Sequence, residues 1–589
     1  MNPAVNQAAH VSEQYWRQKS GLKLKRLLSW TTIVLVLVIS WRAAEIRPTA
    51  FFEPSAVASV IAFLRGLFPP DLSPSFLRVV GAAALQTLAI AIAGTALSIV
   101  IGMPLGMLAT PTLWQRGVLV AGERPGASKL LLAGLSRATR ALLGLLRAIP
   151  DLVWGLLFVV AVGLGSLAGT LALAVSYAGV LGRVYADVFE DVDQQALEAL
   201  HATGATRTQV FLFAVWPQAA ASISAYTLYS FECCVRAASV LGFIGAGGIG
   251  YEINISMRLF EYGQVLTLVA MLLGLVAATD AASRFIRRRL RANAPAGSLA
   301  HQRVEDEENP RPRRIFTSQV KRRVAPAVLT IVIAAGFYFV GFLDLVSADS
   351  GVLTRSARFV AKMFPPELDP VFLRSLMVPL VQTIGISVMG TLIGVFIGAA
   401  LALPATSTVV FGEDDESGRR FFLKRSARRV VYYSARLVLN ILRSIPELIW
   451  VLVCVLAVGL GPFAGTLAIG LHTGGVLGKL YAETLEEVPA RPIEALRAAG
   501  ARPLQILLWG VWPQARAMLV SYTVLRWDFN LRVATVLGLV GGGGLGQSIY
   551  NNIQLGFYPR VSTLIAIIYI LVLVTNWLGD KLRPQRVAL

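Results

Sequence analysis

The stretch Arg147–Gly165 reads RAIPDLVWGLLFVVAVGLG, and the stretch Arg443–Gly461 reads RSIPELIWVLVCVLAVGLG. Both are apolar runs with a proline near the start, and an arginine and an acid flank that proline. The match extends without a net insertion over residues 68–250 and 364–546, always at a spacing of 296 positions. The chain is therefore a tandem duplication of one unit, and its function is expected where the two copies meet.

Composition indicates what kind of unit was duplicated. Hydrophobic residues make up 55% of the 589 residues, charged residues only 15%, and the mean hydropathy is +0.64. A soluble chain of this length would carry more charge. The apolar residues gather in runs of about 20, enough for a helix to cross a bilayer. Helices are the expected form because backbone groups in lipid must be satisfied within the segment.

The sequence thus predicts an all-α polytopic membrane protein with two parallel repeats of six transmembrane helices. The first segment has a basic flank like that of a signal peptide, but its counterpart in the second repeat is internal, so we expect a retained helix. The twelve expected spans are residues 27–44, 82–108, 139–165, 167–187, 215–240 and 262–285, and then 324–345, 376–404, 435–461, 463–483, 511–536 and 561–580.

Positive charge is distributed unevenly along the chain. The net charge is +20, and the stretch 284–323 alone holds twelve Lys/Arg and four acids. The loop 109–140 and its repeat are also basic. Because a Lys/Arg excess marks the cytoplasmic side, we expect a multi-pass membrane protein with both termini in the cytoplasm. The loops 188–214 and 484–510 are then cytoplasmic as well.

The same placement of charge argues against a nucleic-acid partner and favours contact with anionic membrane lipid. It also suggests how the chain is organised. We expect a first unit at 1–283, a flexible basic linker at 284–323 on the cytoplasmic side, and a second unit at 324–589.

Patterns typical of enzymes are missing or out of context. The glycine runs Gly245–Gly250 and Gly541–Gly546 fit a dinucleotide fingerprint, but each follows a membrane span instead of a strand. The three cysteines lie in apolar runs, and the four histidines show no metal-ligand spacing. We therefore expect no cofactor, no metal and no catalysis by this chain; any ATP hydrolysis would belong to separate subunits.

The two cytoplasmic loops carry the strongest functional pattern. Each has Glu-Ala-Leu, then a glycine, and a closing Trp-Pro, which predicts two short helices joined by a glycine turn. Such a piece can insert into a groove of a soluble partner, although an ordinary interhelical loop is the alternative. The pattern resembles the EAA loop of ABC importer permeases, with Leu where that family usually has Ala. The resemblance implies ATPase docking by Glu198, Ala199 and Gly204 in one copy and by Glu494, Ala495 and Gly500 in the other.

Longer strings narrow the resemblance. The segments RSIPELIW, GGVLGKLYAETLEEV and SYTVLRWDFNLRVATVLGLVGGGGLG, with their first-repeat partners, are similar to the permease of phosphonate ABC importers. The chain looks like a tandem fusion of two such units with the type I ABC importer permease fold. The resemblance implies two ATPase subunits on the cytoplasmic side and a periplasmic or extracellular substrate-binding protein. It also implies phosphonates or related phosphorus oxyanions, such as phosphite or phosphate, as substrates.

Charged residues inside the spans are candidates for the substrate path, because ionisable groups in the membrane are rarely incidental. Glu232 and Arg236 are four residues apart in one span, and Asp528 and Arg532 repeat this pair in the second copy. At that spacing the acid shares a helix face with the arginine and can neutralise it. Arg147/Asp151 and Arg443/Glu447 have the same spacing around the prolines. The arginine fork suits phosphonate oxygens, and glycine runs can bring backbone N–H groups to an anion. A purely structural ion pair and a plain helix break are the alternatives. The path candidates are Glu232, Arg236, Asp528 and Arg532, with Gly245, Gly247, Gly541 and Gly543.

Two other functional classes remain open from the sequence. Twelve spans in two parallel halves also describe a stand-alone secondary transporter of a small anion, and a channel or membrane scaffold is a third possibility. An importer permease for another small solute fits the same motifs. The twin EAA-like loops favour the importer, because a carrier has no need of them.

Overall fold

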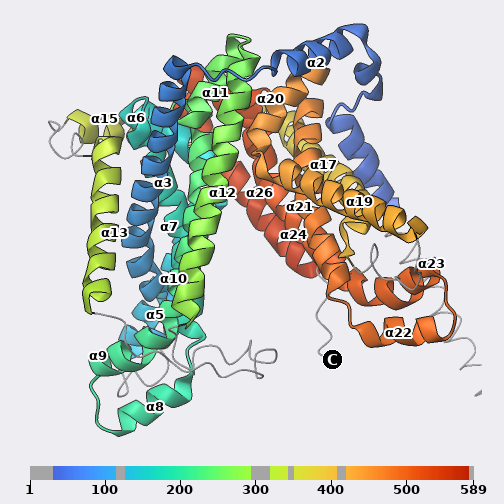
Figure 1. Cartoon of the computed structure of the whole chain (residues 1–589). Coiled ribbons are helices and arrows are strands. Elements are labelled where there is room, and N and C mark those ends of the chain that lie inside the picture. The colour runs from blue at the N-terminus through green and yellow to red at the C-terminus, as the bar shows by residue number, and fades with distance from the viewer. Residues whose placement is uncertain (1–30, 115–125, 293–318, 343–350, 408–418, 583–589) are drawn as a thin grey trace, which may run out of the picture.

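The structure, a computed structural model, describes residues 31–114, 126–292, 319–342, 351–407 and 419–582 (Figure 1). Helices are the only regular secondary structure within these ranges. This confirms the all-α fold class, and it follows from the long apolar segments, whose backbone groups pair within each helix.

The first repeat begins with a short apolar helix, Thr31–Ala43. Its later elements are η1 (Pro48–Phe52), α2 (Pro54–Gly66), α3 (Pro74–Ala109), α4 (Pro111–Trp114), α5 (Gly126–Ala148), α6 (Asp151–Val162), α7 (Ser166–Glu190), α8 (Gln194–Ala202), α9 (Arg207–Val210), η2 (Phe211–Val215), α10 (Trp216–Leu241), η3 (Gly242–Ile244), α11 (Ile249–Arg258) and α12 (Tyr262–Ala292).

The second repeat follows the same order. Its elements are α13 (Gln319–Val340), α15 (Gly351–Lys362), α16 (Pro370–Ser375), α17 (Met377–Ala405), α19 (Arg419–Ser444), α20 (Glu447–Val458), α21 (Pro462–Glu486), α22 (Ala490–Ala498), α23 (Pro503–Gln505), η4 (Ile506–Val511), α24 (Trp512–Leu537), η5 (Gly538–Val540), α25 (Gly544–Gln554) and α26 (Tyr558–Leu582).

Helical structure coincides with each of the twelve expected spans. Within the described ranges, six helices are long and apolar enough to cross a bilayer unbroken, and three more candidates are pairs bent at a short break. The other three expected spans fall on the short apolar helices Thr31–Ala43 and Ala327–Val340 and on α21. The chain is thus polytopic, as the periodic apolar runs predict.

Proline bends the third span of each repeat sharply. The axes of α5 and α6 differ by 88°, and those of α19 and α20 by 98°. Pro150 and Pro446 stand at the N-caps of α6 and α20, because a proline ring ends the preceding helix but suits the start of the next one. These prolines therefore account for the bend in the third span of each repeat.

The first helix of each repeat packs against the other repeat. Helix α13 lies beside α3 (Figure 1), where a Cβ added at Gly336 would be 3.1 Å from Cγ2 of Ile92. Helix Thr31–Ala43 lies against α17, where a Cβ added at Gly385 would be 3.0 Å from the carbonyl oxygen of Ser40. Glycine at such crossings lets the two backbones approach closely. The two repeats are therefore interlocked.

Further contacts tie the halves together. Helix α2 contacts α20, α15 contacts α6, and α26 contacts α5. One buried cluster combines residues of both repeats, among them Ala238 and Leu241 with Leu448 and Val451. The core of the molecule is thus the interface between the repeats. Helices α8 and α22 lie at one end of the molecule and α2 and α15 at the other, and the two bundles spread apart towards α8 and α22 (Figure 1).

Three segments expected as loops or linker are partly helical. The linker expected at 284–323 begins with the last residues of α12, which continues to Ala292, and ends with the first turn of α13. Only 293–318, including its acidic run, lies outside the described residues. The basic loop 109–140 and its repeat likewise contain most of α5 and the first half of α19. Amphipathic spacing extends these helices beyond their apolar runs, so the helices are longer than the spans that the apolar runs predict.

Candidate functional site

Two exposed helical pairs form the end of the molecule opposite α2 and α15 (Figure 1). In the first repeat the pair is α8 and α9, and in the second it is α22 and α23. Each long helix of a pair turns an apolar residue inward, as Leu197 does on α8, while Glu198 and Ala199 are exposed. Glu494 and Ala495 are exposed on α22 in the same way. The expected pattern of a short helix, a turn and a second short helix is confirmed.

A glycine ends the long helix of each pair. Gly204 and Gly500 have φ values of 83° and 77°, a left-handed conformation that a side chain disfavours and that ends many helices. The N–H of Gly500 donates to the carbonyl oxygen of Arg497 at 2.8 Å, and the N–H of Ala501 donates to that of Leu496 at 3.0 Å. Open space surrounds both glycines. The turn is thus fixed locally and accessible from outside.

Each pair is joined to a long span through a π-helical segment. The segments are η2, which leads into α10, and η4, which leads into α24. Helix segments of this type are uncommon and often mark functional positions. Helix α10 carries Glu232 and Arg236, and α24 carries Asp528 and Arg532. Each exposed pair is therefore joined through consecutive helical segments to the path candidates of its repeat.

A repeated arginine anchors the base of each exposed pair. Arg436 on α19 donates from Nη2 to both carboxylate oxygens of Glu486 at 2.8 and 2.9 Å, and from Nε to the carbonyl oxygen of Ala405 at 3.1 Å. Arg140 on α5 makes the matching contacts to Glu190 and Ala109. Since Glu190 and Glu486 end α7 and α21, each arginine connects three helices directly before an exposed pair begins.

The path candidates on α24 pair as their spacing predicts, but those on α10 do not. Arg532 forms an ion pair with Asp528 within α24. Glu232 instead faces α12, where Nη2 of Arg287 lies 2.8 Å from its Oε1. The expected pairing of Glu232 with Arg236 is therefore wrong. A cation from a neighbouring helix supplied the partner, which spacing along one helix cannot reveal.

The expected pairs around the prolines do not form either. Asp151 accepts a hydrogen bond from Oγ of Ser176 at 2.5 Å, and Arg443 donates from Nε to Asn440 at 3.0 Å. The reason is the bend of 88° or 98° between the arginine and the acid, because residues four apart share a face only along a continuous helix.

The arginines of the two repeats instead lie within electrostatic range of one another. Arg147 feels the charges of Arg532 and Asp528 of the second repeat. Arg443 feels the charge of Arg236 of the first repeat. The relation between Arg147 and Arg532 is therefore repeated by Arg443 and Arg236. Nε of Arg236 and Nε of Arg532 are buried and have no hydrogen-bond partner among the described residues.

A buried charged cluster in the second repeat was missed by the sequence reasoning. Nη2 of Arg526 and Nε2 of His472 each lie 3.2 Å from Oε1 of Glu447. The first repeat has Asp151, Ser176 and Ser230 at these three positions. A position-by-position comparison of the repeats contains this signal, because a histidine and an arginine in the second copy correspond to serines in the first.

The glycine runs break the helices at the end of α10 and α24. Their backbone is already engaged: the N–H of Gly248 donates to Gln86 at 2.8 Å, and the N–H groups of Ile249 and Leu545 donate to Thr87 and Thr383, each at 2.9 Å. Gly245, Gly247, Gly541 and Gly543 thus stand in turns tied to α3 and α17. The runs thus break the helices, as one interpretation of them predicts, and their part in the substrate path stays a prediction.

The fold and these sites define an inner-membrane component of a binding-protein-dependent transport system. The family model of that description matches residues 131–292 and 421–587, once in each repeat, and the chain belongs to this family. It is a family of transport permeases that act with a substrate-binding protein and ATPase subunits. The recognition of a duplicated ABC importer permease of type I fold is confirmed.

Individual relatives extend the comparison. The phosphate-import permease protein PhnE of Mycolicibacterium smegmatis is 30% identical over 551 residues, which cover 94% of this chain and 93% of that protein. The phosphite transport system permease protein PtxC of Stutzerimonas stutzeri is 34% identical over 259 residues, which cover 44% of this chain and 87% of that protein. Among solved structures, an inward-facing MetNI methionine ABC transporter chain is 23% identical with a TM-score of 0.31, covering 36% of this chain and 97% of that chain.

Proposed function

We propose that this chain is the complete translocation path of an ATP-driven importer for phosphonates or related small phosphorus oxyanions, phosphite and phosphate included. The observation that carries the proposal is a buried arginine at the same position of each repeat, Arg236 and Arg532, whose Nε has no hydrogen-bond partner among the described residues. Arg147 and Arg443 lie within electrostatic range of Arg532 and Arg236, respectively. A guanidinium presents a planar fork of donors that matches the oxygens of a phosphonate. The names of the relatives, which transport phosphate and phosphite, support the same ligand class.

The path residues would act as a group. Arg236 and Arg532 each keep a buried Nε without a hydrogen-bond partner among the described residues, so each has a donor left for a ligand. Between transport events, Asp528 would neutralise the guanidinium of Arg532, and Glu232 would neutralise that of Arg287. Gly245, Gly247, Gly541 and Gly543 would contribute only if the contacts of their runs to α3 and α17 open during transport.

The exposed helical pairs would couple this path to ATP hydrolysis. Two ATPase subunits would dock, one on Glu198, Ala199 and Gly204 and the other on Glu494, Ala495 and Gly500. The exposure of these residues and the direct continuation of each pair into α10 or α24 support this assignment. The binding protein would then deliver the ligand at the opposite end, between α2 and α15.

We place this chain in the bacterial cytoplasmic membrane with α8, α22 and both termini on the cytoplasmic side. The basic starts of α5 and α19 lie towards the exposed pairs, and a Lys/Arg excess is typical of the cytoplasmic side. A stand-alone secondary transporter is the competing function. It is disfavoured because it gives no use to two equivalent exposed helical pairs.

Import into proteoliposomes tests the proposal. The chain would be reconstituted with its ATPase and binding protein, and uptake of methylphosphonate, phosphite, phosphate and methionine would be measured with and without ATP. We expect ATP-dependent uptake of at least one phosphorus oxyanion and none of methionine. Uptake driven by an ion gradient without ATPase would support the carrier instead, and ATP-driven uptake of methionine alone would refute the ligand class.

A further inference from the structure

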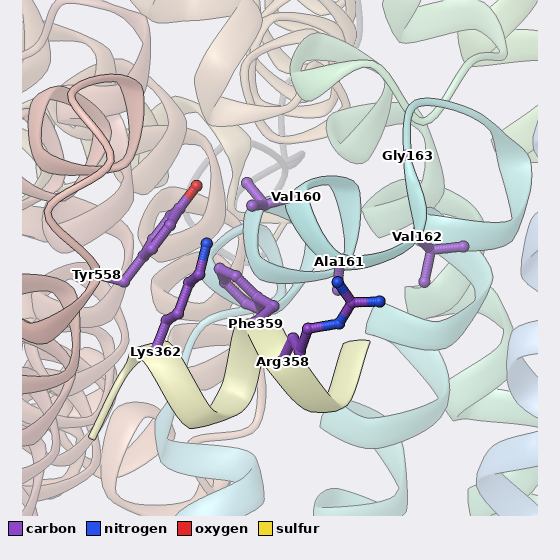
Figure 2. A pocket seen from close by; sticks show the side chains of 8 residues that line it. All are labelled: Val160, Ala161, Val162, Gly163, Arg358, Phe359, Lys362 and Tyr558. Carbon is purple, nitrogen blue, oxygen red and sulfur yellow. The ribbon is translucent and has the colours of Figure 1, made fainter. Parts of the chain in front are cut away.

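A cavity at the α2/α15 end carries two cations that no other feature of the proposed path uses. It lies between α15, the end of α6 and the start of α26, and its volume is about 340 Å³, in the range of small-molecule sites. Arg358, Phe359 and Lys362 line it from α15, and Tyr558 lines it from α26 (Figure 2).

The polar groups of this cavity are free to meet a ligand. Figure 2 shows the ammonium group of Lys362 and the hydroxyl of Tyr558 on one side of the Phe359 ring, and the guanidinium of Arg358 on the other. Both cations are exposed, and neither forms an ion pair within the described residues. No acidic side chain is among the described residues that line the cavity. The cavity therefore offers donors and positive charge without a built-in counter-ion.

The first repeat keeps the scaffold of this cavity but not its charge. Phe63 and Tyr262 form an edge-on ring pair at 5.0 Å, and Phe359 and Tyr558 form its equivalent at 5.1 Å. At the positions of Arg358 and Lys362, however, the first repeat has alanine and Gly66. A Cβ added at Gly66 would lie 2.6 Å from Cδ2 of Tyr262. A lysine has no room there unless the tyrosine moves, so the charged cavity belongs to the second repeat alone.

We propose that Arg358, Lys362 and Tyr558 bind the oxyanion group of a phosphorus compound at this end of the second repeat. An arginine fork and an ammonium group are the usual pair of cations around such groups, and the phenol adds a neutral donor. The bound group is either a free phosphorus oxyanion awaiting transport, an identity that rests on the proposed function, or the phosphate of an anionic lipid head group. Both sources present the same chemistry to the site.

Equilibrium binding to the purified full chain, without partner proteins, tests the site. Radiolabelled inorganic phosphate would be titrated in a maltoside detergent, and retention of phosphatidylglycerol would be measured in parallel by native mass spectrometry. The test variant is Arg358→Gln with Lys362→Gln. The matched control is Arg65→Gln, which neutralises an exposed arginine of α2 at the same end of the molecule.

The two arms separate the sources. Weaker phosphate binding in the double variant, by about tenfold or more for the loss of charge-assisted hydrogen bonds, with unchanged lipid retention, identifies a site for the free oxyanion. Lost retention of phosphatidylglycerol with unchanged phosphate binding identifies a head-group site. The control should behave like the unmodified chain in both arms.

Two results would overturn the proposal. One is that neither ligand distinguishes the double variant from the control. The other is a lower melting temperature with unchanged binding, which would mean that the two cations stabilise the C-terminal carbonyl end of α6 instead. Each is independent of the import experiment, because the substrate panel uses the unmodified chain and this test uses no ATPase.

Discussion

Removal of Arg526 should destabilise the second repeat, and copying the corresponding residues of the first repeat should restore part of the lost stability. Glu447, His472 and Arg526 are largely buried, with 19%, 11% and 13% of their side chains exposed. The substitution Arg526→Ser leaves the Glu447 carboxylate buried without its arginine. Breaking a buried pair by removing one partner typically costs about 3–5 kcal/mol of unfolding free energy. We expect a loss in that range.

The first repeat supplies the repaired arrangement. There Asp151 accepts a hydrogen bond from Ser176 at 2.5 Å, and a serine occupies the position of Arg526. The triple change Glu447→Asp, His472→Ser and Arg526→Ser copies that arrangement into the second repeat. It removes the arginine and the histidine and lets a hydroxyl donate to the shorter acid. We expect it to lose less than half as much free energy as Arg526→Ser alone, because a serine at position 472 can hydrogen-bond the shorter acid as Ser176 does with Asp151.

Reversible unfolding in mixed micelles, by titration with SDS, measures both free energies. The change Ser230→Ala in the first repeat is the matched control, since it alters the position equivalent to Arg526 without touching a charge. Its loss should stay below about 1 kcal/mol. A loss below about 1 kcal/mol for Arg526→Ser, or a triple variant as unstable as the single one, would refute the reasoning.

Three further predictions concern transport. The substitution Gly500→Trp strains the left-handed turn after α22, but the space around that turn is open. The chain should therefore fold, while ligand-stimulated ATP hydrolysis is lost. Full ATP hydrolysis in this variant would contradict docking at the turn. The double change Arg532→Gln with Asp528→Asn removes both buried charges together; the chain should stay stable but import methylphosphonate poorly, whereas normal import would assign the pair to packing alone. The change Arg436→Gln frees Glu486 at the base of an exposed pair; stability should fall by about 1 kcal/mol while ATP hydrolysed per ligand imported rises, and an unchanged ratio would exclude a role in coupling.

The sequence alone was sufficient for the class of fold and for the exposed pairs. Apolar runs of membrane length locate a helix at each expected span, because the bilayer leaves the backbone no other local solution. Pro150 and Pro446 locate the bends, since a proline cannot continue a helix. The Glu-Ala-Leu and glycine pattern locates α8, α22 and their turns. All of these depend on residues close together in the chain.

Only the tertiary structure decided which helices and charges meet. The first helix of each repeat packs on the other repeat, as α13 does on α3. Packing on its own repeat would satisfy the same apolar pattern, so the sequence does not distinguish the two arrangements. Glu232 pairs with Arg287 on α12 and not with Arg236 on its own helix, α10. A buried carboxylate takes whichever cation the packing brings within reach, because desolvation makes any unpaired charge costly. Spacing along the chain specifies only neighbours on one helix, so the partners across the interface were fixed by the fold.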